Sequence, residues 1–246
     1  MFLRFDDEKL PQTHVDIFTL IRDNKTLELI DYVQRNPEPC KEYIDDDKRT
    51  LLHAACELQS VELVKSVIDI APNVNVVDSG LWTPLLIAVA GAPSNTELDT
   101  TSQIVDILLS KGADVKLMTK KKGTVFHYSR GRVDLLEKFY EKWQEGASQR
   151  DVYGNTPLHR AVASGNMKCV NFLLKHTKTV LSQNSMLKTP LHVACEEQNE
   201  EVVKLLIDNG ADADMKDEDD KFAFPLISDK VMFNEICQYY KNRNHK

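Results

Sequence analysis

The stretch "GNTPLHRAVASGN" at residues 154–166 decides the fold, because versions of it recur along the chain. The related segments are "RTLLHAAC" from Arg49, "WTPLLIAV" from Trp82, "GTVFHYS" from Gly123 and "KTPLHVAC" from Lys188. Their threonines are Thr50, Thr83, Thr124, Thr156 and Thr189, and successive spacings are 33, 41, 32 and 33 residues. A near-constant period of this length indicates a stack of small structural repeats.

Each repeat has the residue types of two short helices. A threonine hydroxyl caps the first helix by accepting a backbone N–H, and the proline that follows fits the first helical position, which needs no N–H donor. The first helix is rich in alanine, and the second carries apolar residues at helical spacing, such as Val61, Val64 and Ile68. Gly112 and Gly210 follow two of the second helices, where a left-handed residue ends a helix.

These features form the T-P-L-H-x-A pattern of the ankyrin repeat. One helix pair cannot bury its own apolar face, so neighbouring repeats must complete one another's core. We therefore expect an all-α ankyrin-repeat solenoid of about seven helix-turn-helix units, with degenerate caps at both ends, forming a single domain over residues 1–246. The predicted repeats span residues 13–45, 46–77, 78–117, 118–150, 151–183 and 184–215, followed by a C-terminal cap at residues 216–246.

Two repeats depart from the pattern. The third has Leu86 where histidine is expected and carries a polar insertion at residues 92–101, which should form a loop between its two helices. We interpret the insertion as a tolerated surface loop, with contact to a partner as the alternative. The fourth repeat is short and lacks the proline, so its first helix should be short as well.

Four histidines occupy the same position in their repeats, and an active site does not need the same imidazole four times. We interpret them as ties that bond the threonine hydroxyl and the backbone of the adjoining turn. The predicted structural set is Thr50, His53, Thr83, His127, Thr156, His159, Thr189 and His192.

Other chemical motifs are weak. The H-x-x-C pairs His53/Cys56 and His192/Cys195 lack the further ligands of a zinc site, and both cysteines should lie on the buried side of a first helix. The sequence contains no phosphate-binding loop, no H-E-x-x-H and no G-x-S-x-G. We therefore predict no metal, no cofactor and no enzymatic activity.

Composition narrows the class of protein further. A net charge of −7 disfavours broad nucleic-acid binding, and no window approaches the roughly 18 apolar residues of a membrane span. Five widely spaced cysteines without C-x-x-C indicate reduced thiols inside a cell, and the N-terminal stretch lacks the apolar core of a secretory signal. We expect an intracellular protein that is monomeric when free.

The concave side of a solenoid, lined by turn tips and first helices, is the expected binding surface. Its charges change from acidic in the second repeat to basic in the fourth, which suits a partner with the reverse order. A solvated face without a ligand is the alternative, as is packing of Trp82 against a neighbouring turn. The candidate partner-binding residues are Asp46, Asp47, Arg49, Asp78, Trp82, Lys122, Tyr128, Arg130 and Arg160.

The chain also resembles the gankyrin family of proteasome assembly chaperones, from about Ile17 to the last helix. The matching stretches are "DKRTLLHAAC", "GLWTPLLIAV", "GNMKCVNFLL", "TPLHVACEEQNEEVVKLLIDNGA" and "DEDDKFAFPL". The family's contact positions match at Glu28, Asp47 and Arg49, and more loosely at Asp78 and Arg130.

The resemblance implies a chaperone of the cytoplasm and nucleus that grips the C-terminal domain of one ATPase subunit of the proteasome regulatory particle. It would escort an assembly intermediate and block premature docking on the core particle. An ankyrin adaptor or inhibitor that binds an unrelated signalling or host protein remains the alternative.

Overall fold

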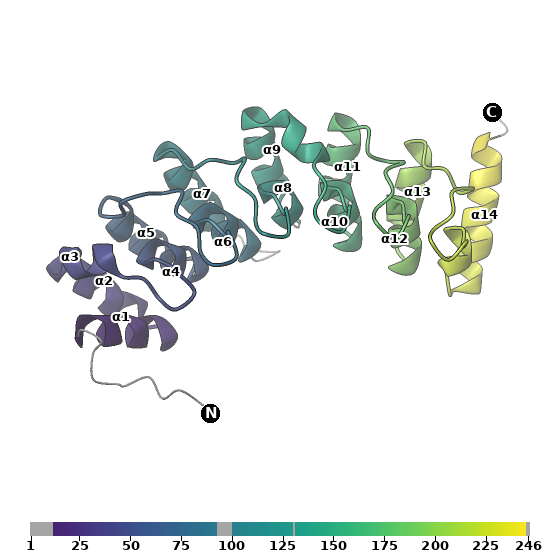
Figure 1. The fold of residues 1–246 in the computed structure, drawn as a ribbon. Helices are drawn as coiled ribbons and strands as arrows, with labels where there is room; N and C mark the ends of the chain where they lie inside the picture. Colours follow the sequence, from purple (N-terminus) through teal and green to yellow (C-terminus); the bar gives the residue numbers. More distant parts are fainter. Residues whose placement is uncertain (1–11, 93–99, 130, 245–246) are drawn as a thin grey trace, which may run out of the picture. The chain divides into compact units, whose positions relative to one another are not determined.

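The computed structural model describes residues 12–92, 100–129 and 131–244 of the chain (Figure 1). The chain divides into two compact units, Met1–Asp114 (unit 1) and Val115–Lys246 (unit 2). Over the described residues the elements are fourteen α-helices and two short 3-10 helices, with no strand. None of these helices is long and apolar enough to cross a membrane. The predicted all-helical repeat fold is confirmed, whereas the single domain over residues 1–246 stays a prediction.

Unit 1 contains an N-terminal helical segment and two helix pairs. α4 packs against both α5 and α6, and α5 packs against α2 and α7, so first helices contact first helices and second helices contact second helices. α3 was not predicted; it begins at Pro37, in the first helical position that proline favours. The elements are α1 (Gln12–Arg22), α2 (Thr26–Arg35), α3 (Pro37–Glu42), α4 (Leu51–Glu57), α5 (Val61–Ile68), α6 (Pro84–Ala90) and α7 (Thr100–Ser110).

Unit 2 repeats the same arrangement. α10 packs against α8 and α12, while α11 packs against α9 and α13. α8 has only four residues, as expected from the missing proline of that repeat. The elements are α8 (Val125–Tyr128), α9 (Val133–Lys142), η1 (Gln144–Ser148), α10 (Pro157–Ala163), α11 (Met167–His176), α12 (Pro190–Glu196), α13 (Glu200–Asp208), η2 (Phe224–Leu226) and α14 (Lys230–Asn244).

The core of each unit runs along the stack, because every helix pair buries its apolar residues against the next pair. In the sixth repeat, Leu191 of α12 and Val202 and Leu206 of α13 are completely buried. Such burial contributes about 1.5–3 kcal/mol for each side chain of this size, which a single helix pair could not obtain alone.

Local residue chemistry sets the ends of the helices. Thr83 caps α6 by accepting the backbone N–H of Leu86 at 3.2 Å, and Pro84 begins that helix. Gly112 and Gly210, which follow α7 and α13, both have φ of +87°. These left-handed glycines end the helices as the sequence predicts.

The insertion of the third repeat lies between α6 and α7, and its residues 93–99 fall outside the described part of the chain. The predicted loop was too long at its C-terminal end, because Thr100 and Thr101 belong to α7. Thr101 is buried, and its hydroxyl donates a 2.6 Å hydrogen bond to the side-chain oxygen of Gln59. This bond to the preceding repeat explains why the helix begins before the end of the polar stretch.

Candidate functional site

The four repeated histidines join neighbouring repeats. In unit 2, Nδ1 of His159 accepts the backbone N–H of Thr156 at 3.2 Å, and Nε2 lies 3.1 Å from the carbonyl oxygen of Lys188. Because Nδ1 accepts an N–H, the hydrogen-bond network assigns the ring proton to Nε2, which donates to Lys188. The same pair of bonds is made by His53 to Thr50 and Trp82, by His127 to Thr124 and Asn155, and by His192 to Thr189 and Lys221.

Burial holds three of these rings in the neutral form. It lowers the pKa of His53 and His127 below their usual value and that of His159 to about 4. Both nitrogens of each ring are already engaged by backbone groups of the same turn and the next repeat. These imidazoles therefore have no nitrogen available for proton transfer or metal binding, and their contacts are those of structural ties.

A second repeated feature escaped the sequence analysis. Five residues before four of the five threonines, and before Phe222 at the corresponding position of the C-terminal cap, an Asp or Asn side-chain oxygen accepts two backbone N–H groups of the same turn tip. Asp151 Oδ1 accepts from Tyr153 and Asn155, both at 2.9 Å. Two backbone N–H groups are accepted in the same way at the other tips, by the side-chain oxygens of Asp45, Asp78, Asn184 and Asp217. The signal was visible as Asp or Asn at a fixed distance before the threonine, and it gives Asp78 a role in shaping the turn.

The acidic tip of unit 1 positions Arg49. Arg49 Nε contacts Asp45 Oδ2 at 2.9 Å, Nη1 contacts Glu57 Oε2 at 3.1 Å, and Nη2 lies 3.9 Å from Asp47 Oδ2. Burial by itself would lower the pKa of Arg49, but the carboxylates of Asp45, Glu57 and Asp47 together more than compensate and the pKa is raised. Asp46 and Asp47 are exposed at the same tip. The guanidinium is thus held in one orientation by carboxylates on both sides.

Two hollows flank Arg49 on the surface formed by the first helices of unit 1 and their turn tips, which we call the first-helix face. One, of about 350 Å³, is lined by Arg49, Glu57, Asp78, Trp82, Ile87, Ala90 and Gly91. The other, of about 370 Å³, is lined by Phe18, Ile21, Arg22, Asn24, Tyr43, Asp45, Arg49, Thr50, Ala54, Glu57 and Leu58. The structure thus brings three predicted site residues, Arg49, Asp78 and Trp82, into one hollow.

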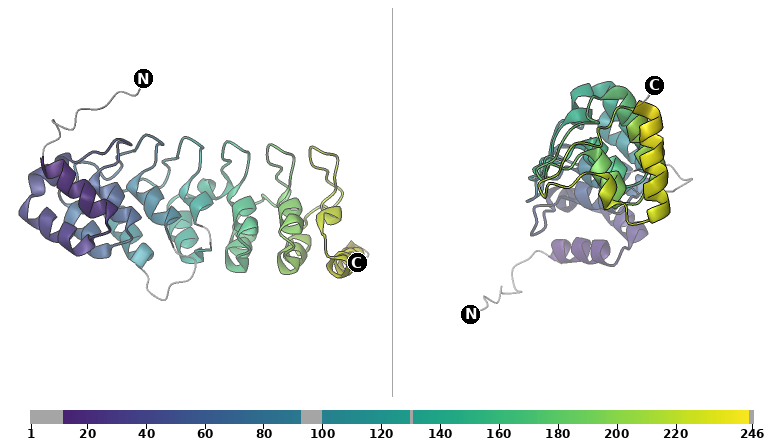
Figure 2. Two further views of the ribbon diagram at one scale, coloured as in Figure 1. Left: turned by 90° about the horizontal axis from the view of Figure 1, so that it is seen from below. Right: turned by 90° about the vertical axis from the view of Figure 1, so that its right-hand side faces the viewer.

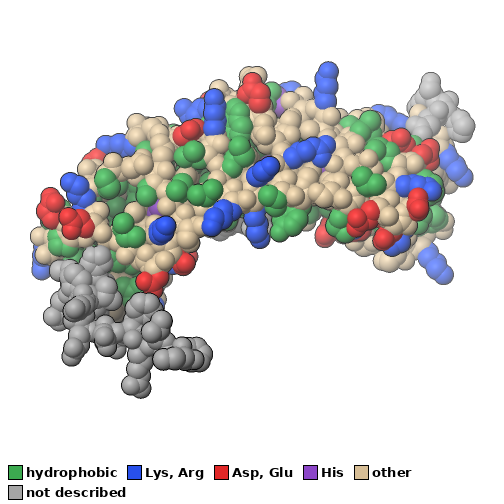
Figure 3. All heavy atoms as spheres, viewed as in Figure 1, with side chains coloured by type: hydrophobic (Ala, Val, Ile, Leu, Met, Phe, Trp, Pro, Cys, Tyr) green, Lys and Arg blue, Asp and Glu red, His purple; other side chains and the backbone are tan. Residues whose placement is uncertain are grey.

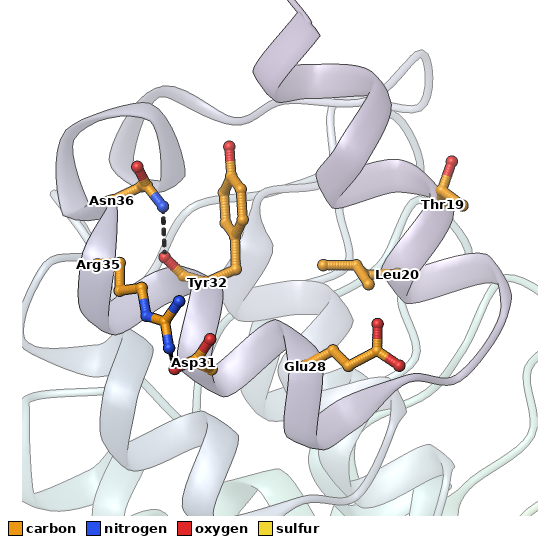
Figure 4. Close-up of a pocket in the computed structure, with 7 residues that line it drawn as sticks. All are labelled: Thr19, Leu20, Glu28, Asp31, Tyr32, Arg35 and Asn36. Carbon is orange, nitrogen blue, oxygen red and sulfur yellow. Dashed lines mark hydrogen bonds and ion pairs between the residues drawn. The ribbon is translucent and has the colours of Figure 1, made fainter.

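Glu28 lies apart from these residues. It lines a third hollow, of about 450 Å³, together with Thr19, Leu20, Asp31, Tyr32, Arg35 and Asn36 (Figure 4). α1 contributes Thr19 and Leu20 to this hollow but Phe18, Ile21 and Arg22 to the hollow beside Arg49, so the two hollows meet different faces of that helix. Glu28 itself lies 3.6 Å from the ammonium of Lys25.

In unit 2, the predicted site residues have different surroundings. Lys122 is exposed at its turn tip with φ of +54°, and the hydroxyl of Tyr128 lies 3.2 Å from that of Thr119. Arg160 pairs with Asp151 at 2.6 Å, which directs its guanidinium toward the tip. Arg130 lies outside the described residues.

The cysteines of the H-x-x-C pairs are buried, as predicted. Cys56 and Cys195 are fully buried and free, and burial raises the pKa of Cys195 to about 12. Thiols of this kind behave as small apolar side chains. Within the described ranges, no group of three or more His, Cys, Asp or Glu residues is arranged to hold a metal ion.

Comparison with known proteins identifies the family. Residues 19–119, 96–184 and 126–217 match the family model "Ankyrin repeats (3 copies)". The chain belongs to the ankyrin-repeat family. An ankyrin repeat-containing protein of Schizosaccharomyces pombe is 29% identical over 228 residues, which cover 91% of this chain and 95% of that protein. Human protein phosphatase 1 regulatory subunit 27 is 28% identical over 115 residues, covering 47% of this chain and 73% of that protein.

Solved ankyrin-repeat structures share the fold. The human ASB11 ankyrin repeat domain has a TM-score of 0.76 at 22% identity, and the alignment covers 94% of this chain and 98% of that one. The ankyrin repeat domain of Bcl-3 has a TM-score of 0.65 at 18% identity, covering 95% of this chain and all of that one. Ankyrin repeats form extended surfaces that bind other proteins, and this chain is accordingly an ankyrin-repeat protein-binding domain.

Proposed function

We propose that unit 1 holds an α-helical segment of a partner protein on its first-helix face and leaves that partner chemically unchanged. The observation that carries the proposal is the position of Arg49, a charged side chain fixed by Asp45 and Glu57 between two hollows. Arginine and tryptophan are frequent anchors of protein interfaces, and a side chain ordered before binding loses less entropy on association.

The spacing of the hollows suits a helix. Neighbouring packed helices lie about 8–10 Å apart, so hollows in successive repeats are separated by roughly that distance. Seven residues of an α-helix rise about 10 Å. A partner helix lying along this face would therefore place residues i and i+7 in the two hollows.

The charges indicate which side chains these would be. Asp46 and Asp47 are exposed beside the hollows, and Glu57 and Asp78 line the one that holds Trp82. A basic side chain of the partner would meet carboxylates and an aromatic ring there, while an apolar side chain would fit against Phe18, Ile21 and Leu58.

More specifically, we infer that the partner is the C-terminal domain of a proteasome regulatory-particle ATPase and that the chain is an assembly chaperone of the cytoplasm and nucleus. The support is the resemblance to the gankyrin family, since "DKRTLLHAAC" and "GLWTPLLIAV" supply Arg49, Trp82 and other residues around one hollow. The mixed charges of the predicted contact residues agree with this partner.

Affinity capture from a cell extract with the full-length chain tests the proposal. We expect it to recover free regulatory-particle ATPases and no mature capped proteasome, and the double substitution Asp46→Lys with Asp47→Lys to abolish the recovery. Glu137→Lys with Glu141→Lys, at exposed positions of α9, is the matched control and should bind normally. Normal capture by the Asp46/Asp47 variant would show that this tip is not the contact. Arg49→Glu is a poorer test, because its carboxylate would face Asp45 and Glu57 and would disturb the tip itself.

A regulatory adaptor or inhibitor with an unrelated client is the second candidate. The observation in its favour is the 28% identity to a protein named as a phosphatase regulatory subunit. In the same capture experiment, this function predicts one dominant unrelated protein and no regulatory-particle ATPase.

A further inference from the structure

The turn tips of unit 2 form a continuous row. Backbone hydrogen bonds join each tip to the next: Val152 N–H donates to Lys121 O at 3.0 Å, Ser185 N–H to Tyr153 O at 2.9 Å, and Glu218 N–H to Met186 O at 3.0 Å. Figure 2 shows these tips side by side along one edge of the helices. We call this row, made of residues 120–122, 152–154, 185–187 and 218–220, the tip ledge.

Side-chain chemistry changes in order along the tip ledge. It begins with three exposed lysines, continues with four large apolar side chains and ends with three acidic ones. Basic side chains lie toward α8 and acidic side chains gather toward α13 and α14 (Figure 3). The lysines are Lys120, Lys121 and Lys122, the acidic residues are Glu218, Asp219 and Asp220, and the apolar residues are Val152, Tyr153, Met186 and Leu187, which are 46%, 51%, 46% and 47% exposed.

The apolar centre is unusual for a turn tip, where small polar residues are the norm. Four adjacent half-exposed apolar side chains make a contiguous patch, and such patches mark sites of protein interaction. Lys121 extends the patch at one end, with its ammonium 6.0 Å from the centre of the Tyr153 ring. About half of the surface of each of these side chains stays exposed in the chain and is available to a second molecule.

The two charged ends differ in strength. Residues 115–129 contain four lysines and no acidic residue. At the other end, Lys221 pairs with Asp219 at 2.9 Å and Lys216 pairs with Asp220 at 3.3 Å, but carboxylates outnumber lysines over residues 216–221. The basic end therefore exerts the stronger and less compensated attraction.

We propose that the tip ledge binds an extended segment of a partner protein whose side chains run acidic, apolar and basic along the ledge. Four tips at the roughly 10 Å spacing of packed repeats span about 30 Å, which about nine extended residues cover at 3.3 Å each. Such a segment places opposite charges on both ends and apolar side chains on Tyr153 and Met186. This surface lies in unit 2 and is independent of the hollows of unit 1.

Other occupants fit the ledge less well. A nucleic acid carries phosphates along its whole length, and residues 218–220 would repel them. A second copy of the chain could match opposite ends, but a stable dimer buries about 1,200–2,000 Å², and a ridge one turn wide offers less.

The direct test uses the fluorescent peptide Asp-Glu-Asp-Leu-Phe-Val-Lys-Arg-Lys and the full-length chain, with binding followed by fluorescence anisotropy. We expect the dissociation constant to rise at least tenfold for a peptide of the same composition with alternating charges. It should also rise at least tenfold for Tyr153→Ser with Met186→Ser. Val231→Ser, which removes a 66% exposed apolar side chain from α14, should leave the dissociation constant unchanged. Equal binding of the two peptides, or no binding of either, overturns the proposal.

Reversing the charge at the basic end of the tip ledge tests the predicted order of charges along the bound segment. In the variant Lys120→Glu with Lys121→Glu, a peptide with basic residues at both ends should bind more tightly than the original peptide, whereas the unchanged chain should prefer the original. The same preference in both proteins overturns the proposal. Sedimentation of the free chain addresses the second copy: a dimer lost in the Tyr153/Met186 variant would assign the ledge to self-association instead.

Discussion

The Nε2 atom of His159 donates a hydrogen bond to the carbonyl oxygen of Lys188 across 3.1 Å, linking repeats through residues 29 positions apart. The other ring nitrogen accepts the backbone N–H of Thr156 at 3.2 Å. One buried side chain therefore satisfies a donor in its own turn and an acceptor in the next repeat. The stability of a repeat stack depends on the interfaces between neighbouring repeats, and this bond stabilises one of those interfaces.

Replacing His159 with leucine should destabilise the chain by about 3 kcal/mol, because a buried N–H and a buried carbonyl each lose their partner. Leucine itself fits this position, since Leu86 occupies it in the third repeat and is buried. Urea unfolding of the full-length chain measures the effect. Lys175→Leu, at an exposed position of α11 in the same repeat, is the control and should change the free energy of unfolding by less than about 0.5 kcal/mol. A loss below 1 kcal/mol for His159→Leu would contradict the tie.

Stability should fall as the solution is acidified from about pH 7 to about pH 5. Burial lowers the pKa of His159 from 6.5 to about 4, while Arg150 and Arg160 lower it and Asp151 raises it to smaller extents. Between pH 6.5 and about pH 4 the unfolded chain therefore binds a proton at His159 and the folded chain does not. The stabilisation that depends on neutral His159 is fully present above pH 6.5 and falls progressively as the pH drops toward 4. His159 alone should account for about 2 kcal/mol over this range.

Asp134 and Asp151 should not contribute to this change, because their pKa values are lowered and they stay charged above pH 4. Urea unfolding at the two pH values provides the measurement, and His159→Leu should show a smaller pH dependence than the unchanged chain. Equal pH dependence in the two proteins would mean that His159 titrates normally in the fold.

Asp151 should tolerate asparagine far better than alanine. Its carboxylate is 4% exposed, accepts two backbone N–H groups and pairs with Arg160 at 2.6 Å. Asn184 makes the same two backbone bonds one repeat later with an amide oxygen, so Asp151→Asn keeps them and loses only the charge pair. Since Arg160 is 43% exposed, solvent screens that pair, and the expected loss is about 1 kcal/mol.

Asp151→Ala leaves both backbone donors of the tip without an acceptor and should cost about 3 kcal/mol. Thermal or urea unfolding of the two variants distinguishes the roles of the side chain. If both variants lose the same stability, the ion pair is the dominant contribution and the turn bonds are not.

The repeat could be predicted from sequence because its information is local and periodic. Thr156 and Pro157 begin a helix through their own chemistry, and the period of the motif predicts that repeats stack. The short α8 followed in the same way from the missing proline. Such features require no knowledge of distant contacts.

The binding residues were harder to predict, because a charged side chain at a turn tip can either stabilise the turn by hydrogen bonding or contact a partner protein. Asp78 looked like a surface charge, but its carboxylate accepts two backbone N–H groups. Glu28 was predicted only from the resemblance to the gankyrin family, and it lines a different hollow from Arg49, with different residues of α1 contributing to each. The sequence does not show that the tips carrying Tyr153 and Met186 are neighbours. The backbone hydrogen bond from Ser185 N–H to Tyr153 O shows that they are, and this makes them part of one surface.

Two glycines with left-handed backbones should respond differently to alanine. Gly154 has φ of +72°, and a Cβ atom there would lie 2.8 Å from the backbone nitrogen of Ser185 in the next repeat. Gly210 has φ of +87°, and a Cβ atom there meets nothing within 4 Å. Left-handed backbone costs alanine about 1–2 kcal/mol, so Gly210→Ala should lose about 1 kcal/mol. Gly154→Ala adds the displacement of a neighbouring backbone and should lose about 3 kcal/mol.

The displaced backbone at Gly154 has a second consequence. Ser185 N–H bonds to Tyr153 O in the tip ledge, so Gly154→Ala should also weaken binding of the acidic-apolar-basic peptide, whereas Gly210→Ala should not. Urea unfolding and peptide anisotropy on the same two variants check both effects. Equal destabilisation of the two variants would show that the neighbouring tip moves aside without loss, and that the row of tips is less rigid than its hydrogen bonds indicate.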